Sequence, residues 1–156
     1  MRTWSKLLVG CAVLLAAACE SEMESDDDRP DKQTFQMSNA PNLPFSSAVR
    51  AGDILFLSGQ IGNIPGTLDL AEGGVTAQTR QTLENIRSVV EFAGSSVDRI
   101  VKCTVFLLDI NDYAEVNAVY AEFFGNDPPA RSALAGSGLA IGASVEIECI
   151  ALAGTE

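Results

Sequence analysis

The order of strand-like and helix-like segments is the feature that most restricts how this chain can fold. Apolar residues recur at helical spacing in two segments, residues 76–93 and a segment that begins at residue 112. Two strand patterns precede the first helical segment, one separates the two, and two follow the second. Two helices and a mixed sheet indicate an α+β two-layer sandwich over residues 34–156, with one sheet face under the helices.

Turn residues set the expected strand boundaries. We expect strands at residues 46–50, 54–58, 100–108, 131–134 and 145–152. In the last strand Glu146 and Glu148 alternate with Val145, Ile147 and Cys149, which places two carboxylates opposite the apolar face. That carboxylate face meets either water or another subunit, and the alternation fits both arrangements.

The two helices carry different end signals. Thr76 is the expected N-cap of the first helix and Gly94 its expected end, while Asp112 and Glu115 have the spacing of a capping box for the second. Pro128 is expected to stop the second helix. The apolar faces are expected to hold Leu83, Ile86, Val90 and Ala93 in the first helix, and Val116, Val119, Tyr120 and Phe123 in the second.

Composition excludes several kinds of active site. The 156 residues include no histidine, so Ser-His-Asp triads, Cys-His pairs and imidazole-ligated zinc sites are impossible. The net charge of −11 argues against nucleic-acid binding, which depends on Lys and Arg contacts with phosphates. Any chemistry must therefore use carboxylates, arginine, thiols, hydroxyls or backbone amides.

The N-terminus has the pattern of a secretory signal. Arg2 and Lys6 flank the start of an apolar run at residues 7–15, and three alanines then lead to Cys19. This ending resembles a bacterial lipobox, which implies removal of a signal peptide at residues 1–18 and lipidation of Cys19. An ordinary secretory signal with an incidental cysteine is the alternative. The expected location is the bacterial cell envelope, on the periplasmic side of the inner or outer membrane.

Residues 19–33 are expected to be a lipidated cysteine followed by a disordered tether. Acidic residues dominate this segment and apolar residues are scarce, so the chain repels itself and cannot form a core. The membrane would then be reached through the lipid anchor alone.

Cys103 and Cys149 are the two cysteines of the expected folded domain. Both alternate with apolar neighbours, which is typical of buried small hydrophobic side chains. An envelope location also permits a disulfide if the two Cα atoms lie within about 7 Å. The sequence leaves both states open.

Six short strings together resemble one protein family. They are LSGQI at 57–61, QTRQTLENI at 78–86, VKCTVFL at 101–107, VNAVY at 116–120 with FF at 123–124, PARSA at 129–133, and VEIECIA at 145–151. Their order and spacing are similar to the YjgF family, the reactive-intermediate (Rid) deaminases. The resemblance implies a chorismate-mutase-like protomer and a homotrimer with a central barrel and three clefts between subunits. It also implies hydrolysis of 2-imino or enamine acids to 2-keto acids and ammonia, without a metal or organic cofactor.

The resemblance makes Arg131 and Glu146 the candidate catalytic residues. Arg131 matches the arginine of the family's Pro-Ala-Arg-Ser string, and its planar guanidinium can bind both oxygens of a substrate carboxylate. Glu146 matches the position that holds water for attack on the imine carbon. Burial at an interface would raise its pKa and make it a better base near neutral pH. Glu148, on the same strand face, is the competing candidate.

Four further positions match substrate-binding positions of the family. They are the backbone groups of Gly59 and Ala133, the helix residue Asn117, and Phe45. Phe45 stands where family members commonly have tyrosine, so the ring is kept and the hydroxyl is lost. Residues 135–140 also depart from the family pattern: glycines and small residues replace an acid and a base. Substrate preference is therefore open.

Three functions are weighed on this basis. The first is a lipid-anchored imine deaminase acting on a small 2-imino acid. The alternative is a non-catalytic trimeric module that binds small carboxylates or a partner. RNA cleavage ranks last, because the chain is acidic and lacks histidine.

Overall fold

The computed structural model describes residues 31–37 and 43–154. Its centre is β7, which pairs antiparallel with β3, β4 and β5 in a seven-stranded sheet. The strand order is β1-β2-β3-β7-β5-β6, and only β6 runs parallel to its neighbour. The strands are β1 (Lys32–Phe35), β2 (Ala48–Ala51), β3 (Ile54–Leu57), β4 (Gln60–Ile61), β5 (Ile100–Leu107), β6 (Ala130–Ala135) and β7 (Val145–Leu152).

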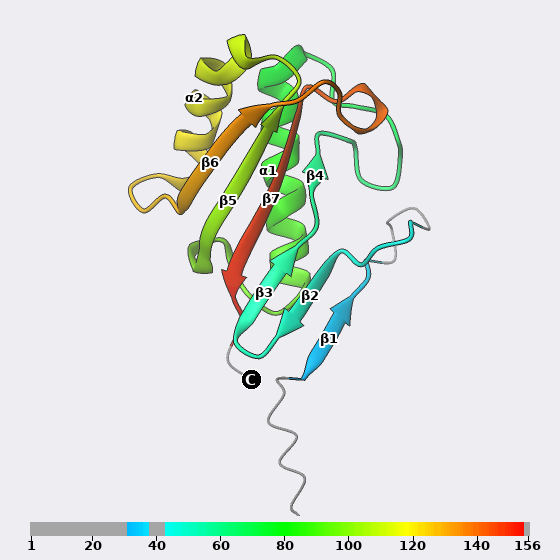
Figure 1. Ribbon diagram of the computed structural model, residues 1–156, viewed down its shortest axis with the longest axis vertical. Helices are drawn as coiled ribbons and strands as arrows, with labels where there is room; N and C mark the ends of the chain where they lie inside the picture. Colours follow the sequence, from blue (N-terminus) through cyan, green and yellow to red (C-terminus); the bar gives the residue numbers. More distant parts are fainter. Residues whose placement is uncertain (1–30, 38–42, 155–156) are drawn as a thin grey trace, which may run out of the picture.

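Both helices, α1 (Gly74–Phe92) and α2 (Tyr113–Phe124), lie on one side of this sheet. In Figure 1 they lie behind the strands, and no helix covers the face turned toward the viewer. The predicted α+β sandwich of a mixed sheet and two helices is therefore confirmed. Three short 3₁₀ turns complete the elements, at Val97–Arg99, Ile110–Asp112 and Ala140–Gly142.

The core lies between the helices and the facing side of the sheet. The apolar face predicted for α1 is buried, as are Val116, Val119 and Tyr120 of α2, while Phe123 is partly buried. Alternate residues of β5 and β7 point into the same layer. Fully burying each large apolar side chain contributes about 1.5–3 kcal/mol, so these two strands and α1 supply much of the stability.

The opposite sheet face keeps apolar side chains exposed. Phe56 on β3, Leu152 on β7 and Leu134 on β6 are each at least 40 % exposed. Glu148 lies on the same face, in register with Thr104. The described residues thus leave uncovered the face that the sequence predicted to meet water or another subunit.

Two short strands were not predicted from the sequence. β1 begins at Lys32, inside the segment expected to be a tether, and pairs residue for residue with β2. β4 has only two residues and pairs with the first half of β7. Backbone pairing with a neighbouring strand forms both, and neither has the alternating apolar pattern that marks a strand in the sequence.

The side-chain caps predicted for the N-termini of the two helices are absent. α1 begins after Gly73, which has a φ of 112° and no side-chain cap, while the Thr76 hydroxyl donates to Glu115 instead. Asp112 does not cap α2; the side chain of Asp109 accepts from the Asn111 N–H and caps the preceding 3₁₀ turn. Gly94, with a φ of 79°, follows the end of α1 as predicted.

The N-terminal predictions mostly lie outside the described residues. The signal peptide at 1–18, Cys19 and most of the tether fall there. In the part of the chain that is described, neither helix has the length and apolarity needed to cross a membrane.

Cys103 and Cys149 form a disulfide between β5 and β7. The two residues lie opposite each other in the antiparallel ladder, with their Cα atoms 4.1 Å apart and both side chains buried. This settles the question left open by the sequence. The bond joins residues 46 positions apart in sequence.

We expect this disulfide to be a major source of stability. Reduction should lower the free energy of unfolding by roughly 2–5 kcal/mol, because the bond restricts the unfolded chain. Urea unfolding with and without reductant measures the difference. A Cys103→Ala/Cys149→Ala variant is the control, since its stability should not respond to reductant. Equal stability of the oxidised and reduced wild type would contradict the prediction.

Candidate active site

The first part of the candidate site forms where the strand opposite β7 is interrupted. β3 pairs with the second half of β7 and β4 with the first half, and Ser58 and Gly59 lie at the break. Glu146 is in register with Ile61 of β4. A Cβ atom at Gly59 would overlap the Glu146 carboxylate, so the glycine makes room for this side chain. The family resemblance had singled out Gly59 only for its backbone groups.

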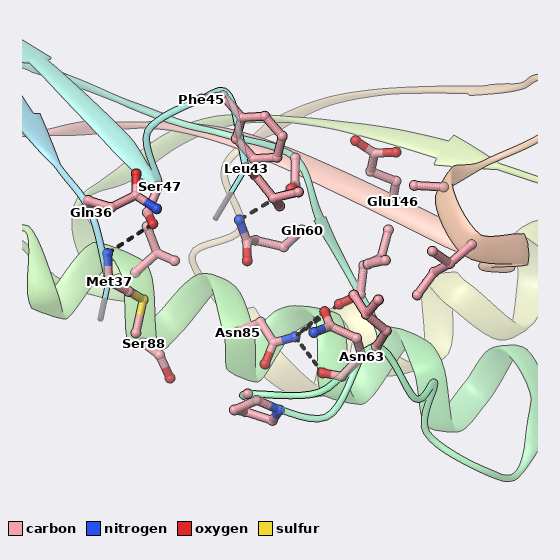
Figure 2. A pocket seen from close by; sticks show the side chains of 18 residues that line it. Gln36, Met37, Leu43, Phe45, Ser47, Gln60, Asn63, Asn85, Ser88 and Glu146 are labelled. Atoms are coloured by element: carbon pink, nitrogen blue, oxygen red, sulfur yellow. Dashed lines mark hydrogen bonds between the residues drawn. The ribbon is translucent and has the colours of Figure 1, made fainter. Parts of the chain in front are cut away.

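Glu146 and Gly59 line a cavity of about 420 Å³, which we call the glutamate pocket. Its walls come from the segment before β2, from β4 and the loop after it, from α1 and from the 3₁₀ turn Ala140–Gly142. Figure 2 shows Phe45 and Leu43 at one side of the hollow and Glu146 at another, with Asn85 and Ser88 of α1 across from them. The pocket thus contains three of the predicted site residues: Phe45, Gly59 and Glu146.

Glu146 has an altered acidity in this pocket. Burial raises the pKa of its carboxyl group, and the negative charge of Glu148 raises the pKa further. Among the described residues, no hydrogen bond or ion pair engages the Glu146 carboxylate. A half-buried carboxyl with a raised pKa and free oxygens can hold a water molecule and exchange a proton with it.

Arg131 on β6 is held by three side chains of α2, and we call these four residues the arginine cluster. Its Nη2 donates to the Asn117 Oδ1 at 2.6 Å and to the Tyr113 hydroxyl at 3.2 Å. The guanidinium carbon also lies 4.6 Å from the centre of the Tyr120 ring. These contacts fix the guanidinium, and its Nε and Nη1 groups donate to no other described residue. They are available to an anion.

The side chains of Arg131 and Glu146 point to opposite faces of the sheet. Arg131 is in register with Cys103, which points into the helix-covered core, whereas Glu146 lies between the core residues Val145 and Ile147 and points the other way. Side chains alternate between faces along a strand. One chain therefore cannot bring Arg131 and Glu146 to the same small ligand.

The structure separates the predicted residues into two groups. Asn117 lies with Arg131 through its hydrogen bond, and Ala133 follows two residues later on β6, packed against the core. The hydroxyl of Ser58, next to Gly59, donates to the Ser46 carbonyl at 2.7 Å. Neither Arg131 nor Asn117 lines the glutamate pocket.

Sequence analysis missed Tyr113 and the second role of Tyr120. Tyr113, Asn117 and Tyr120 are spaced by four and three residues, which places them on one helix face beside Arg131. This helical spacing could have identified the shared face from the sequence. The Tyr120 hydroxyl is buried without a hydrogen-bond partner among the described residues, and burial raises its pKa to about 12.

No metal-binding cluster occurs among residues 31–37 and 43–154, where no group of three or more His, Cys, Asp or Glu could hold an ion. The chemistry available to the two groups of residues is binding of a carboxylate at Arg131 and proton transfer at Glu146.

The chain resembles known proteins over nearly all of the described residues. The family model described as "Endoribonuclease L-PSP" matches residues 37–153. Human 2-iminobutanoate/2-iminopropanoate deaminase is 39 % identical over 125 residues, which cover 79 % of this chain and 91 % of the human protein. A RutC family protein of Pyrococcus horikoshii is 45 % identical over 122 residues, 77 % of this chain and 97 % of that protein.

Solved structures agree with this relationship. The YjgF gene product of E. coli superimposes with a TM-score of 0.71 at 41 % identity, covering 77 % of this chain and 98 % of that one. E. coli TdcF, crystallised with bound serine, has a TM-score of 0.71 at 37 % identity with the same coverage.

The raised pKa of Glu146 gives a stability prediction with a defined sign. A raised pKa in the folded state means that ionising the carboxyl costs stability, and the cost appears as pH rises through that pKa. Glu146→Gln should therefore be more stable than wild type at pH 7, by less than about 1 kcal/mol because the group is only half-buried. The gain should vanish below about pH 4, where an ordinary glutamate is protonated.

Urea unfolding at pH 4 and pH 7 checks this. Glu148→Gln should give part of the gain, because it removes the second cause of the shift. Glu91→Gln, an exposed carboxylate at the end of α1, should change stability by less than about 0.5 kcal/mol. A Glu146→Gln variant that is less stable than wild type at pH 7 would refute the assignment.

Proposed function

The chain belongs to the endoribonuclease L-PSP family, which includes the Rid proteins, and from this we propose that it hydrolyses 2-imino acids to 2-keto acids and ammonia. The observation that carries the proposal is the pair of groups just described: a fixed guanidinium with free N–H donors, and an unpartnered carboxylate with a raised pKa. The human relative that is named as an imine deaminase supports the reaction type.

The proposed reaction needs two tasks from the protein. Arg131 binds the substrate carboxylate and so orients the adjacent carbon–nitrogen double bond. Glu146 holds a water molecule and accepts its first proton as the oxygen bonds to the imine carbon, and the nitrogen takes up this proton to give a carbinolamine. The carbinolamine hydroxyl then passes its proton through Glu146 to the nitrogen as the carbon–nitrogen bond breaks, the carbon–oxygen double bond forms and ammonia leaves. Positioning and proton transfer are sufficient help for a reaction of this kind. The relative crystallised with serine supports binding of a small carboxylate.

We propose that the site is completed by a second copy of the chain within a homotrimer. Because Arg131 and Glu146 lie on opposite faces of one sheet, a shared ligand requires Arg131 from one subunit and Glu146 from its neighbour. The uncovered face, with Phe56, Leu134 and Leu152 exposed, supports burial against other copies in a central barrel.

Ammonia release from imines generated in situ by an amino-acid oxidase tests the reaction. Glu146→Gln should lower kcat about 100-fold and Arg131→Ala should chiefly raise KM. Glu91→Gln and Arg80→Ala are the matched controls and should stay near wild type, since Glu91 is exposed at the end of α1 and Arg80 pairs with Glu122 at the surface. Full activity in both site variants would refute the proposal. Binding of 2-keto acids without turnover would favour the non-catalytic carboxylate-binding module instead.

Mixed oligomers are the second arm of the same test. Arg131→Ala and Glu146→Gln chains refolded together should regain about one quarter of wild-type activity, because one cleft in four then combines an intact arginine with an intact glutamate. Two inactive variants that form mixed trimers without regaining activity would show that the site lies within one chain.

We further propose that the protein is exported and anchored by a lipid on Cys19. The lipobox-like ending at Ala16-Ala17-Ala18-Cys19 is the main support. The buried Cys103–Cys149 disulfide adds independent support, since such bonds persist in oxidising compartments outside the cytosol. The acidic residues that follow Cys19 fit a tether between the membrane and the folded part.

Cell fractionation tests the anchor. The full chain should sediment with membranes and partition into detergent, while Cys19→Ser should lose the detergent partitioning. Cys11→Ser is the matched control and should behave as wild type, because Cys11 lies within the proposed signal peptide. Equal partitioning of the Cys19→Ser variant would rule out a lipid at this residue.

A further inference from the structure

We propose that the glutamate pocket selects 2-imino acids with a large apolar side chain, such as those derived from leucine, methionine or phenylalanine. The inference rests on the imine hydrolysis proposed above and specifies its substrate class. These substrates are larger than the three- and four-carbon imino acids for which the human relative is named.

The size of the pocket is the first argument. A cavity of about 150 Å³ is already large enough for benzene. The glutamate pocket has about 420 Å³ and includes the Glu146 carboxylate in its wall. A substrate whose imine carbon faces Glu146 therefore has room beside the reacting atoms for an isobutyl or benzyl group. A methyl or ethyl group would leave most of the cavity unfilled.

The chemistry of the walls is the second argument. Apolar side chains come from four separate segments around the cavity: Leu43 and Phe45 before β2, Ile61 on β4, Leu68 in the following loop, and Ile141. In the single chain Phe45, Leu68 and Ile141 are each about half exposed or more, so an apolar ligand, together with the second copy that supplies Arg131, would remove their surfaces from water. The phenylalanine at position 45 adds a ring without a hydroxyl.

Three amide and hydroxyl side chains beside the reacting centre already donate to protein carbonyls, which is the third argument. The Asn85 amide donates to the carbonyls of Ile61 and Asn63 and accepts from Gln81. The Gln60 amide donates to the Ser58 and Gly59 carbonyls, and the Ser88 hydroxyl to the Glu84 carbonyl. A polar substrate side chain would find these donors engaged, whereas an apolar one needs none of them.

The conformation of Ile141 is the fourth argument. Its φ of 48° is the only positive value at a non-glycine residue in the described chain, and β-branched residues adopt it at a cost. Strained residues persist where the surrounding structure requires them, and they concentrate at ligand sites. Ile141 directly follows residues 135–140, where the sequence departs from the family pattern, and it adds an apolar wall to the pocket.

Competition between side-chain sizes tests the inference. Imines are generated from alanine, 2-aminobutyrate, leucine and phenylalanine by an L-amino-acid oxidase with catalase, at rates matched by oxygen consumption. Semicarbazide traps the imine that escapes hydrolysis. We expect kcat/KM to be at least about ten-fold higher for the leucine and phenylalanine imines than for the alanine imine.

Pocket variants show whether this preference comes from the walls. Ile141→Asn suits a positive φ and introduces a polar amide, so it should reduce the preference about ten-fold without loss of folding. Leu68→Asn, at an exposed loop position, should act in the same direction. Ile110→Asn is the matched control, because Ile110 is exposed to a similar degree and lies outside the pocket. It should leave the preference unchanged.

The outcomes separate this inference from the proposed function. Hydrolysis of all four imines at similar rates, or a preference for the alanine imine, would overturn the inference and leave the deaminase proposal standing. No hydrolysis of any imine would overturn the deaminase proposal. Calorimetry with pyruvate and 4-methyl-2-oxopentanoate then provides the second readout. Tighter binding of the larger keto acid supports the apolar pocket, and equal binding overturns it.

Discussion

Side chains along β7 alternate between the helix-covered core and the uncovered face, and the candidate site depends on this alternation. Val145 and Ile147 are held in the core, so Glu146 between them must point away from it. On β6, two strands away, Arg131 shares the core side with Cys103. The geometry of one sheet thus creates two incomplete groups. Assembly of copies is the simplest way to combine them on one ligand.

Glu146 illustrates how a functional group can oppose stability. Its carboxylate loses hydration, faces the charge of Glu148, and receives no compensating hydrogen bond from the described residues. Gly59 admits the side chain into this position because it has no Cβ. In contrast, the arginine cluster satisfies part of its guanidinium internally. The carboxylate of Glu146 is therefore free to bind and exchange a proton, whereas the guanidinium of Arg131 is fixed in one orientation.

The elements predicted correctly from the sequence are those whose apolar residues recur with the period of a helix or a strand. The apolar face of α1 and the alternation in β5 and β7 were correct because burial repeats every 3.6 or 2 residues. β1 and β4 were missed because pairing with a neighbouring strand defines them. The N-terminal caps failed because the Thr76 hydroxyl bonds to Glu115 and the Asp112 side chain makes no capping bond. The identity of Arg131 and Glu146 came from the family resemblance. Their placement on opposite faces follows from the pairing of β5 with β6 and β7, which no local pattern contains.

The Cys103–Cys149 bond has a consequence for resistance to proteolysis. It joins two inner strands, and the chain between them includes α2 and the exposed turn around Gly125 and Pro128. A protease that cuts this turn once produces two fragments that remain covalently attached across the sheet. Both fragments still hold their places in the core, so a nicked domain keeps its shape until the sulfur–sulfur link is also broken.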